Sequence, residues 1–176
     1  DIVLVNYYFP AHEAGLYAAA SILGKAVMYL PGGIAMALFP MVAENHARSQ
    51  GSAHLLLQAV GLTALLSGAG AVFYFLFGEE IVALLYGEHY RGAGAVLKFY
   101  GFVILPMALV LVAEHFLIAK GRVLFAYLFL FIAPLQFIAV HFFHDSLQMV
   151  LAVVGVSGLI LTLLGYGLLW RTFERI

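Results

Sequence analysis

The amino-acid sequence predicts an all-α, polytopic membrane helical bundle, and three observations support this fold class. Apolar residues make up 65% of the 176-residue chain, and charged residues only 10%. A soluble domain carries about 25% charged and about 45–50% apolar residues, and a chain this short cannot hide so much apolar side chain from water. Five apolar stretches are each long enough to cross about 30 Å of hydrocarbon as a helix. These stretches are unbroken rather than alternating, which argues against a β-barrel and predicts helices.

The five predicted spans leave only short connections between them. In chain order the spans cover residues 16–39, 55–77, 93–118, 123–143 and 147–170. Residues 1–9 are expected to be the end of a further membrane helix that starts before Asp1, so the chain is interpreted as the C-terminal transmembrane bundle of a larger protein. Residues 78–92 form the longest predicted connection, and the apolar run 81–85 inside it is interpreted as an interfacial turn or a short helix.

Residue types exclude several kinds of site. The chain has no cysteine, so disulfides and thiolate metal sites are excluded. Its net charge is −1 and it has no basic run, so nucleic acid is not an expected partner. His141, His144 and Asp145 have the spacing of a weak metal site, but histidine is also common near membrane interfaces, and the interfacial interpretation is preferred. We predict no metal, no cofactor, no catalytic residues and no enzyme activity.

The distribution of basic residues predicts the orientation in the membrane. One face holds the 44–54 loop, the 120–122 turn and the C-terminal tail, and it carries Arg48, Lys120, Arg122, Arg171 and Arg175. The opposite face carries Arg91, and Lys98 lies just inside it. Because cytoplasmic loops are enriched in Lys and Arg, the first face is predicted to be cytoplasmic, and the C-terminus with it. The expected location is therefore the cytoplasmic (inner) membrane, crossed several times.

Polar residues inside the first span are the candidates for function. Tyr17, Ser21, Lys25 and Tyr29 recur every four residues, which places them on one face of a helix. An ionisable side chain deep in a bilayer costs about 2.5–3.5 kcal/mol on insertion scales and usually faces protein or water. Two interpretations of Lys25 stay open: the helix lines a wet cavity, or Lys25 pairs with a carboxylate and locks two helices together.

Two further features lie close to this polar face in the sequence. Pro31, Gly32 and Gly33 interrupt the same span and predict a helix kink, because proline removes a backbone hydrogen bond and glycine loosens the turn. Asp1 is a second candidate cavity residue if the helix that ends at residue 9 places it inside the membrane. The alternative for Asp1 is a position near an interface with no role.

Several segments resemble one known family. Residues 1–44 resemble the seventh and eighth helices of Wzx-like polysaccharide-export flippases, which belong to the multidrug/oligosaccharidyl-lipid/polysaccharide exporter superfamily. The matching elements are Asp1, the EAGLYAAA segment at 13–20, and LFP at 38–40 followed by Glu44. Residues 85–95 and the turn at 118–122 also look family-like, so the resemblance extends over the whole chain.

The resemblance implies both an architecture and a cargo. The family fold has two bundles of six helices that alternate access around a central cavity, so this chain is expected to supply the end of one helix and five full transmembrane helices of a MATE/MOP-like half. The N-terminal half of the same transporter, the lipid bilayer and a lipid-linked glycan are the expected partners. The implied function is transport of an undecaprenyl-diphosphate-linked oligosaccharide or polysaccharide precursor. The alternatives are a drug/cation antiporter or a peptidoglycan-precursor flippase of the same superfamily, and a membrane glycosyltransferase or polymerase.

Overall fold

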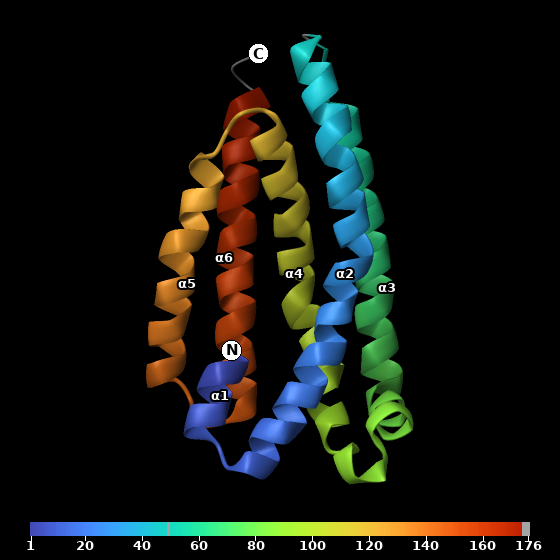
Figure 1. Cartoon of the computed structure of the whole chain (residues 1–176), viewed down its shortest axis with the longest axis vertical. Helices are drawn as coiled ribbons and strands as arrows, with labels where there is room; N and C mark the ends of the chain where they lie inside the picture. Colours follow the sequence, from blue (N-terminus) through green and yellow to red (C-terminus); the bar gives the residue numbers. More distant parts are fainter. Residues whose placement is uncertain (49, 174–176) are drawn as a thin grey trace.

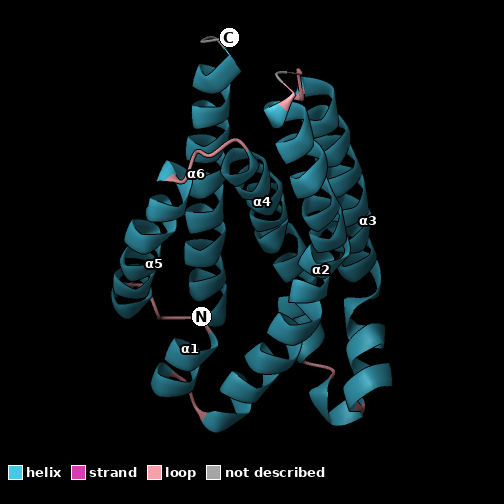
Figure 2. Cartoon of the chain, turned by 45° about the horizontal axis from the view of Figure 1, so that its top comes forward, coloured by secondary structure: helices cyan, strands magenta, loops and turns pink. Residues whose placement is uncertain are grey.

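The structure, a computed structural model, describes residues 1–48 and 50–173, with the side chains of residues 30, 124, 126 and 171–173 excepted. It is built from helices, and the described residues contain no strand (Figures 1 and 2). The elements are α1 (Ile2–Tyr8), α2 (Ala11–Ala47), α3 (Ala53–Tyr86), the short 3-10 helix η1 (Glu88–Tyr90), α4 (Ala93–Ala119), α5 (Leu124–Phe142) and α6 (Leu147–Phe173).

The five long helices lie at the five predicted spans, which confirms an all-helical bundle. Among the described residues, four helices are long and apolar enough to cross a membrane: α2, α3, α4 and the 147–170 part of α6. The described apolar part of α5, 127–142, is shorter. Helix α5 as a whole has 19 residues, which corresponds to about 28 Å at 1.5 Å per residue.

The helices run up and down, so the connections alternate between two ends of the bundle (Figure 1). One end holds residues 48 and 50–52, the turn at 120–123 and the end of α6, and the other holds the turns at 9–10, 87–92 and 143–146. These are the two groups of connections on which the charge argument depends. Arg48, Lys120 and Arg122 lie at the first end, whereas Arg175 lies outside the described residues.

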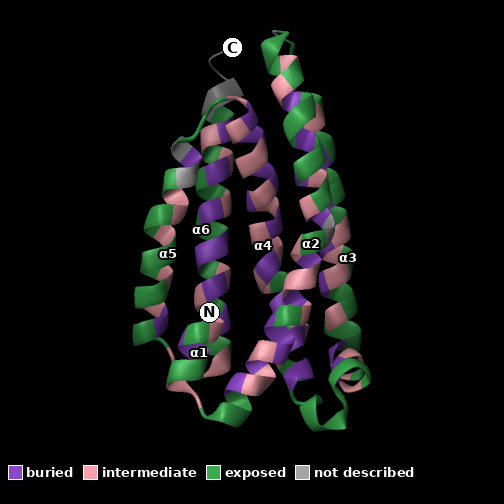
Figure 3. Ribbon diagram, viewed as in Figure 1, coloured by how far each residue is buried: buried purple, intermediate pink, exposed green. Residues whose placement is uncertain are grey.

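Helix α4 is the centre of the bundle, because it packs against α2, α3 and α6. Figure 3 shows that buried residues gather where these helices face one another, while α5 at the edge is largely exposed or intermediate. Small residues allow the close approach of α3 to α4. A Cβ added at Gly101 would lie 2.8 Å from Cα of Ala71, so these two backbones are nearly in contact.

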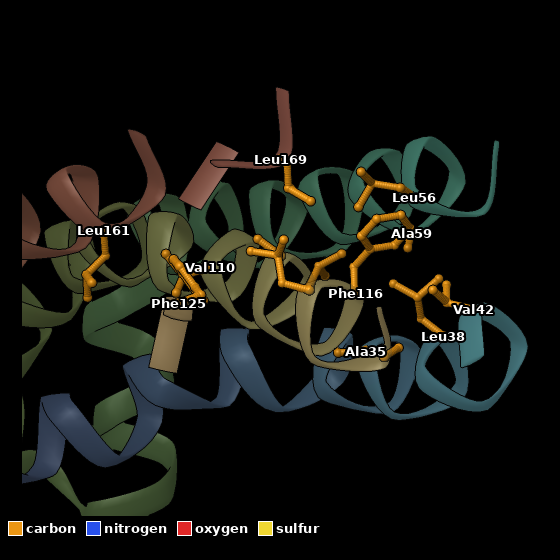
Figure 4. Close-up of a cluster of buried hydrophobic side chains, with 14 residues drawn as sticks. Ala35, Leu38, Val42, Leu56, Ala59, Val110, Phe116, Phe125, Leu161 and Leu169 are labelled. Atoms are coloured by element: carbon orange, nitrogen blue, oxygen red, sulfur yellow. The ribbon is translucent and has the colours of Figure 1, made fainter. Parts of the chain in front are cut away.

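A large apolar cluster joins α4 to the other long helices toward the end that holds the 120–123 turn (Figure 4). Phe116 of α4 is fully buried and packs in one cluster with Leu38 and Val42 of α2, Leu56 of α3 and Leu169 of α6. Phe125, at the start of α5, belongs to the same cluster and anchors that end of the helix, while the buried Val140 anchors the other end in a second cluster. Between these anchors α5 packs mainly on α6.

The prediction that a connection begins at residue 78 is wrong. Helix α3 continues to Tyr86 across a local distortion at Phe77, where φ is −123° and ψ is 18°. Contacts with α4 explain the extension: Glu79 pairs with Lys98 at 2.5 Å, and Val82 is buried together with Leu97. The apolar run 81–85 is helical, which agrees with the short-helix interpretation of this run, and its packing on α4 makes it the continuation of α3.

Candidate functional site

The candidate site is centred on the carboxylate of Asp1, which accepts four hydrogen bonds. Its Oδ1 accepts from Nζ of Lys25 at 3.1 Å and from the backbone N–H of Ile2 at 2.9 Å. Its Oδ2 accepts from the hydroxyl of Tyr17 at 3.2 Å and from the hydroxyl of Tyr100 at 2.6 Å. The site therefore combines one ion pair with two phenol donors from different helices.

A tight turn explains why Asp1 meets residues of α2. Phe9 is extended, with φ −108° and ψ 154°, as expected for a residue before proline, and Pro10 precedes the first residue of α2. The chain therefore folds back, and α1 packs along the first part of α2. Asp1 lies about 10 Å along α1 from Tyr8 at 1.5 Å per residue, level with the residues of α2 that reach it.

Burial differs sharply between the members of the site. Tyr17 and Tyr100 are fully buried, and their rings make an edge contact with centroids 6.0 Å apart. The side chain of Asp1 is 11% exposed, whereas that of Lys25 is 29% exposed. The tyrosine hydroxyls are therefore fixed by packing, while Lys25 lies at the open edge of the site.

The four residues of the predicted polar stripe differ from one another in their contacts and their exposure. Tyr17 and Lys25 contact Asp1, as described. Ser21 is buried, and its hydroxyl donates to the carbonyl of Ala18 in its own helix at 3.1 Å. Tyr29 is 69% exposed and is not among the residues that donate to Asp1. The stripe thus runs from a buried end at Tyr17 to an exposed end at Tyr29.

Helix α2 continues through Pro31, Gly32 and Gly33 as one helix and changes direction near its middle (Figure 1). Pro31 has no N–H, so the carbonyl of Val27, four residues earlier, loses its helical partner. The hydroxyl of Ser67 in α3 donates to this carbonyl at 3.1 Å. A neighbouring helix therefore satisfies the polar group that the proline leaves open, as a membrane span requires.

Sequence reasoning missed Tyr100 as a member of the site. Tyr100 lies on α4, and its ring packs against Gly24, where any added Cβ would collide with it. The only available signal was a tyrosine inside an apolar span, and nothing in that signal indicates which helix its hydroxyl reaches. Gly24, adjacent to Lys25, gives the ring room to approach α2 closely.

A second cluster of titratable residues lies near the 143–146 turn. The hydroxyl of Tyr8 hydrogen-bonds to Nδ1 of His141, and the ring of Tyr8 stacks on that of His144 with centroids 4.0 Å apart. Among the described residues, no group of three His, Asp or Glu side chains could hold a metal ion. The histidines thus join α1 to the end of α5 and the following turn through Tyr8.

Comparisons of the chain with protein-family models, curated proteins and solved structures find no match. Chemically, the site presents one partly exposed ammonium group beside a carboxylate whose other acceptor positions are occupied. An ammonium group carries three donors, of which Asp1 accepts from one, so the chemistry of this group is compatible with an additional anion.

Proposed function

We propose that this chain is part of a membrane transporter that flips a lipid-linked oligosaccharide across the cytoplasmic membrane by alternating access. The observation that carries the proposal is Lys25: a lysine within a long apolar helix, paired with Asp1 and still 29% exposed. Ionisable residues within membrane spans are costly and mark substrate or ion pathways. The partial exposure of the Lys25 side chain leaves its ammonium group accessible to a second anion.

An anionic cargo fits the chemistry of Lys25. The diphosphate of an undecaprenyl-diphosphate-linked glycan carries diffuse negative charge, and an ammonium group binds such charge without demanding one geometry. Hydrogen bonds to charged groups contribute about 1.5–3 kcal/mol. One cation with two free donors can therefore hold a diphosphate during transport and release it afterwards.

The architecture also supports a transporter. Short connections join antiparallel helices, and large apolar side chains are exposed along α3 and α5, where lipid or the N-terminal half of the same protein would cover them. Short connections favour transport over a membrane glycosyltransferase or polymerase, which needs catalytic groups on a sizeable loop. A drug/cation antiporter is the second candidate, and the observation in its favour is the carboxylate of Asp1 in the same site.

Replacing Lys25 tests the proposal. In the complete protein, expressed in a strain that lacks the gene, Lys25→Ala is expected to lower glycan export per molecule about tenfold, the equivalent of about 1.4 kcal/mol. Lys25→Arg is expected to retain part of the activity because it keeps the charge. Surface glycan and membrane abundance are measured together, so that loss of protein is separated from loss of transport.

Lys98→Ala is the matched control, because Lys98 also forms an ion pair between helices, with Glu79, but outside the site. Its export per molecule is expected to equal that of the unmodified protein. Unchanged export per molecule for Lys25→Ala would refute a role in cargo contact. Reduced abundance with proportionate export would show that Lys25 only holds α1 and α2 together.

A further inference from the structure

We propose that Asp1 is a positioning residue that holds Lys25 between transport cycles, and that Tyr17 and Tyr100 make this hold reversible, so that Lys25 can pass from Asp1 to the diphosphate of the cargo. The inference rests on the proposed function, because it specifies how the same site is regulated. It follows from the unequal burial and mobility of the donors around one carboxylate.

The carboxylate of Asp1 keeps hydrogen-bond donors when Lys25 leaves it. A carboxylate without partners in a low-dielectric interior is costly, so an isolated Asp1–Lys25 pair would resist opening. Asp1 keeps two side-chain donors from other helices, the hydroxyls of Tyr17 and Tyr100. The carboxylate therefore stays hydrogen-bonded after the lysine departs, which lowers the free energy of the open state.

Lys25 is the donor of the site that is able to move. The Ile2 N–H belongs to the backbone, and both tyrosines are fully buried, with Tyr100 packed against Gly24. Lys25 has four rotatable bonds to its ammonium group and the most exposed side chain of the site. Of the four donors, Lys25 is therefore the one that can exchange between Asp1 and an incoming anion.

Substitutions at Asp1 and at the two tyrosines are expected to change the affinity for an anion in opposite directions. Asp1→Asn keeps an oxygen that accepts from the tyrosines but removes the charge that competes for Lys25, so an anion should bind more tightly. Tyr17→Phe and Tyr100→Phe remove donors from the carboxylate, so Asp1 should hold Lys25 more strongly and an anion should bind more weakly. If the network only stabilised the fold, all three variants would bind the anion more weakly or not at all.

The experiment uses the complete protein in lipid nanodiscs and farnesyl diphosphate as the probe, with farnesol as its uncharged counterpart. The apparent Kd is expected to fall about five- to tenfold in Asp1→Asn, because a larger fraction of molecules then has a free lysine. It is expected to rise about threefold in Tyr17→Phe and in Tyr100→Phe, the effect of one lost hydrogen bond. Thermal unfolding of each variant is recorded in parallel.

Tyr166→Phe is the matched control, because its hydroxyl also bonds across helices, to the carbonyl of Leu109, but its ring packs against the apolar cluster of Phe116 and not against the one that contains Tyr17 and Tyr100. Its apparent Kd should not change. Weaker binding in Asp1→Asn, or unchanged binding in both tyrosine variants, would overturn the inference. If Asp1→Asn cannot be purified, Asp1→Gln replaces it, because it also keeps an accepting oxygen and removes the charge, whereas weaker binding in the tyrosine variants alone is also what a structural network predicts.

The failure of the inference can be told apart from the failure of the proposed function. If farnesyl diphosphate binds in a Lys25-dependent manner but the Asp1 and tyrosine variants do not shift the Kd in opposite directions, only the exchange of Lys25 is wrong. If the probe binds no better than farnesol, or binds equally well to Lys25→Ala, the diphosphate role of Lys25 is wrong and both proposals fall.

Discussion

A cysteine in place of Asp145 is expected to react with a membrane-impermeant maleimide in intact cells, whereas a cysteine in place of Gln50 is expected to react only after the membrane is permeabilised. Both side chains are exposed, and they lie at opposite ends of the bundle (Figure 1). Arg48 and Lys120 lie at the same end of the bundle as Gln50, and this basic end is predicted to be cytoplasmic. The chain contains no cysteine of its own, so only cysteines in the rest of the protein have to be replaced before labelling.

A second pair of positions provides the control for this experiment. Glu88 lies at the same end of the bundle as Asp145, and Val123 lies at the same end as Gln50. Glu88 and Val123 are both exposed. Cysteines at Glu88 and Asp145 should label together, and those at Val123 and Gln50 should be protected together. The reverse pattern would invert the orientation, and a mixed pattern would contradict the alternation of helices.

Replacing Gly94 by alanine is expected to remove most of the folded protein from the membrane. A Cβ at Gly94 would lie 2.5 Å from Cα and 2.7 Å from N of Glu79, which are backbone atoms that cannot rotate away. The last turns of α3 would therefore separate from α4, and the ion pair between Glu79 and Lys98 would open. Such overpacking typically costs about 1–3 kcal/mol, and more where backbone must move.

The measurement is the folded fraction after heating, followed by size-exclusion chromatography of a fluorescent fusion of the complete protein. Gly68→Ala is the matched control, because a Cβ at Gly68 on α3 meets no atom within 4 Å. Alanine also favours the helix by about 1 kcal/mol relative to glycine, so this control should be neutral or slightly stabilising. Equal stability of the two variants would show that α3 and α4 do not approach each other as closely as the structure indicates.

The sequence by itself determined the class of fold and the number of long helices. Apolar length and composition are local properties, and lipid allows only internally hydrogen-bonded segments, so the runs at 16–39 and 93–118 had to be helical. The alternation of connections followed from the short links between the spans. A short helix at 81–85 was one of the two interpretations of that run, but its continuity with the preceding span was missed, because Glu79 pairs with Lys98 of α4, a residue distant in the sequence.

Only the tertiary structure decided which polar residues form the site. Lys25 and Asp1 were separate candidates in the sequence, and Tyr100 lies 99 residues from Asp1 along the chain. Their meeting depends on the turn at Pro10 and on the glycine that lets α4 approach α2 at Gly24. Of the two interpretations of Lys25, the structure shows the carboxylate pair and leaves the lysine partly exposed. The physical reason is that hydropathy places a residue at a depth in the membrane, whereas side-chain packing chooses the helix faces that meet there.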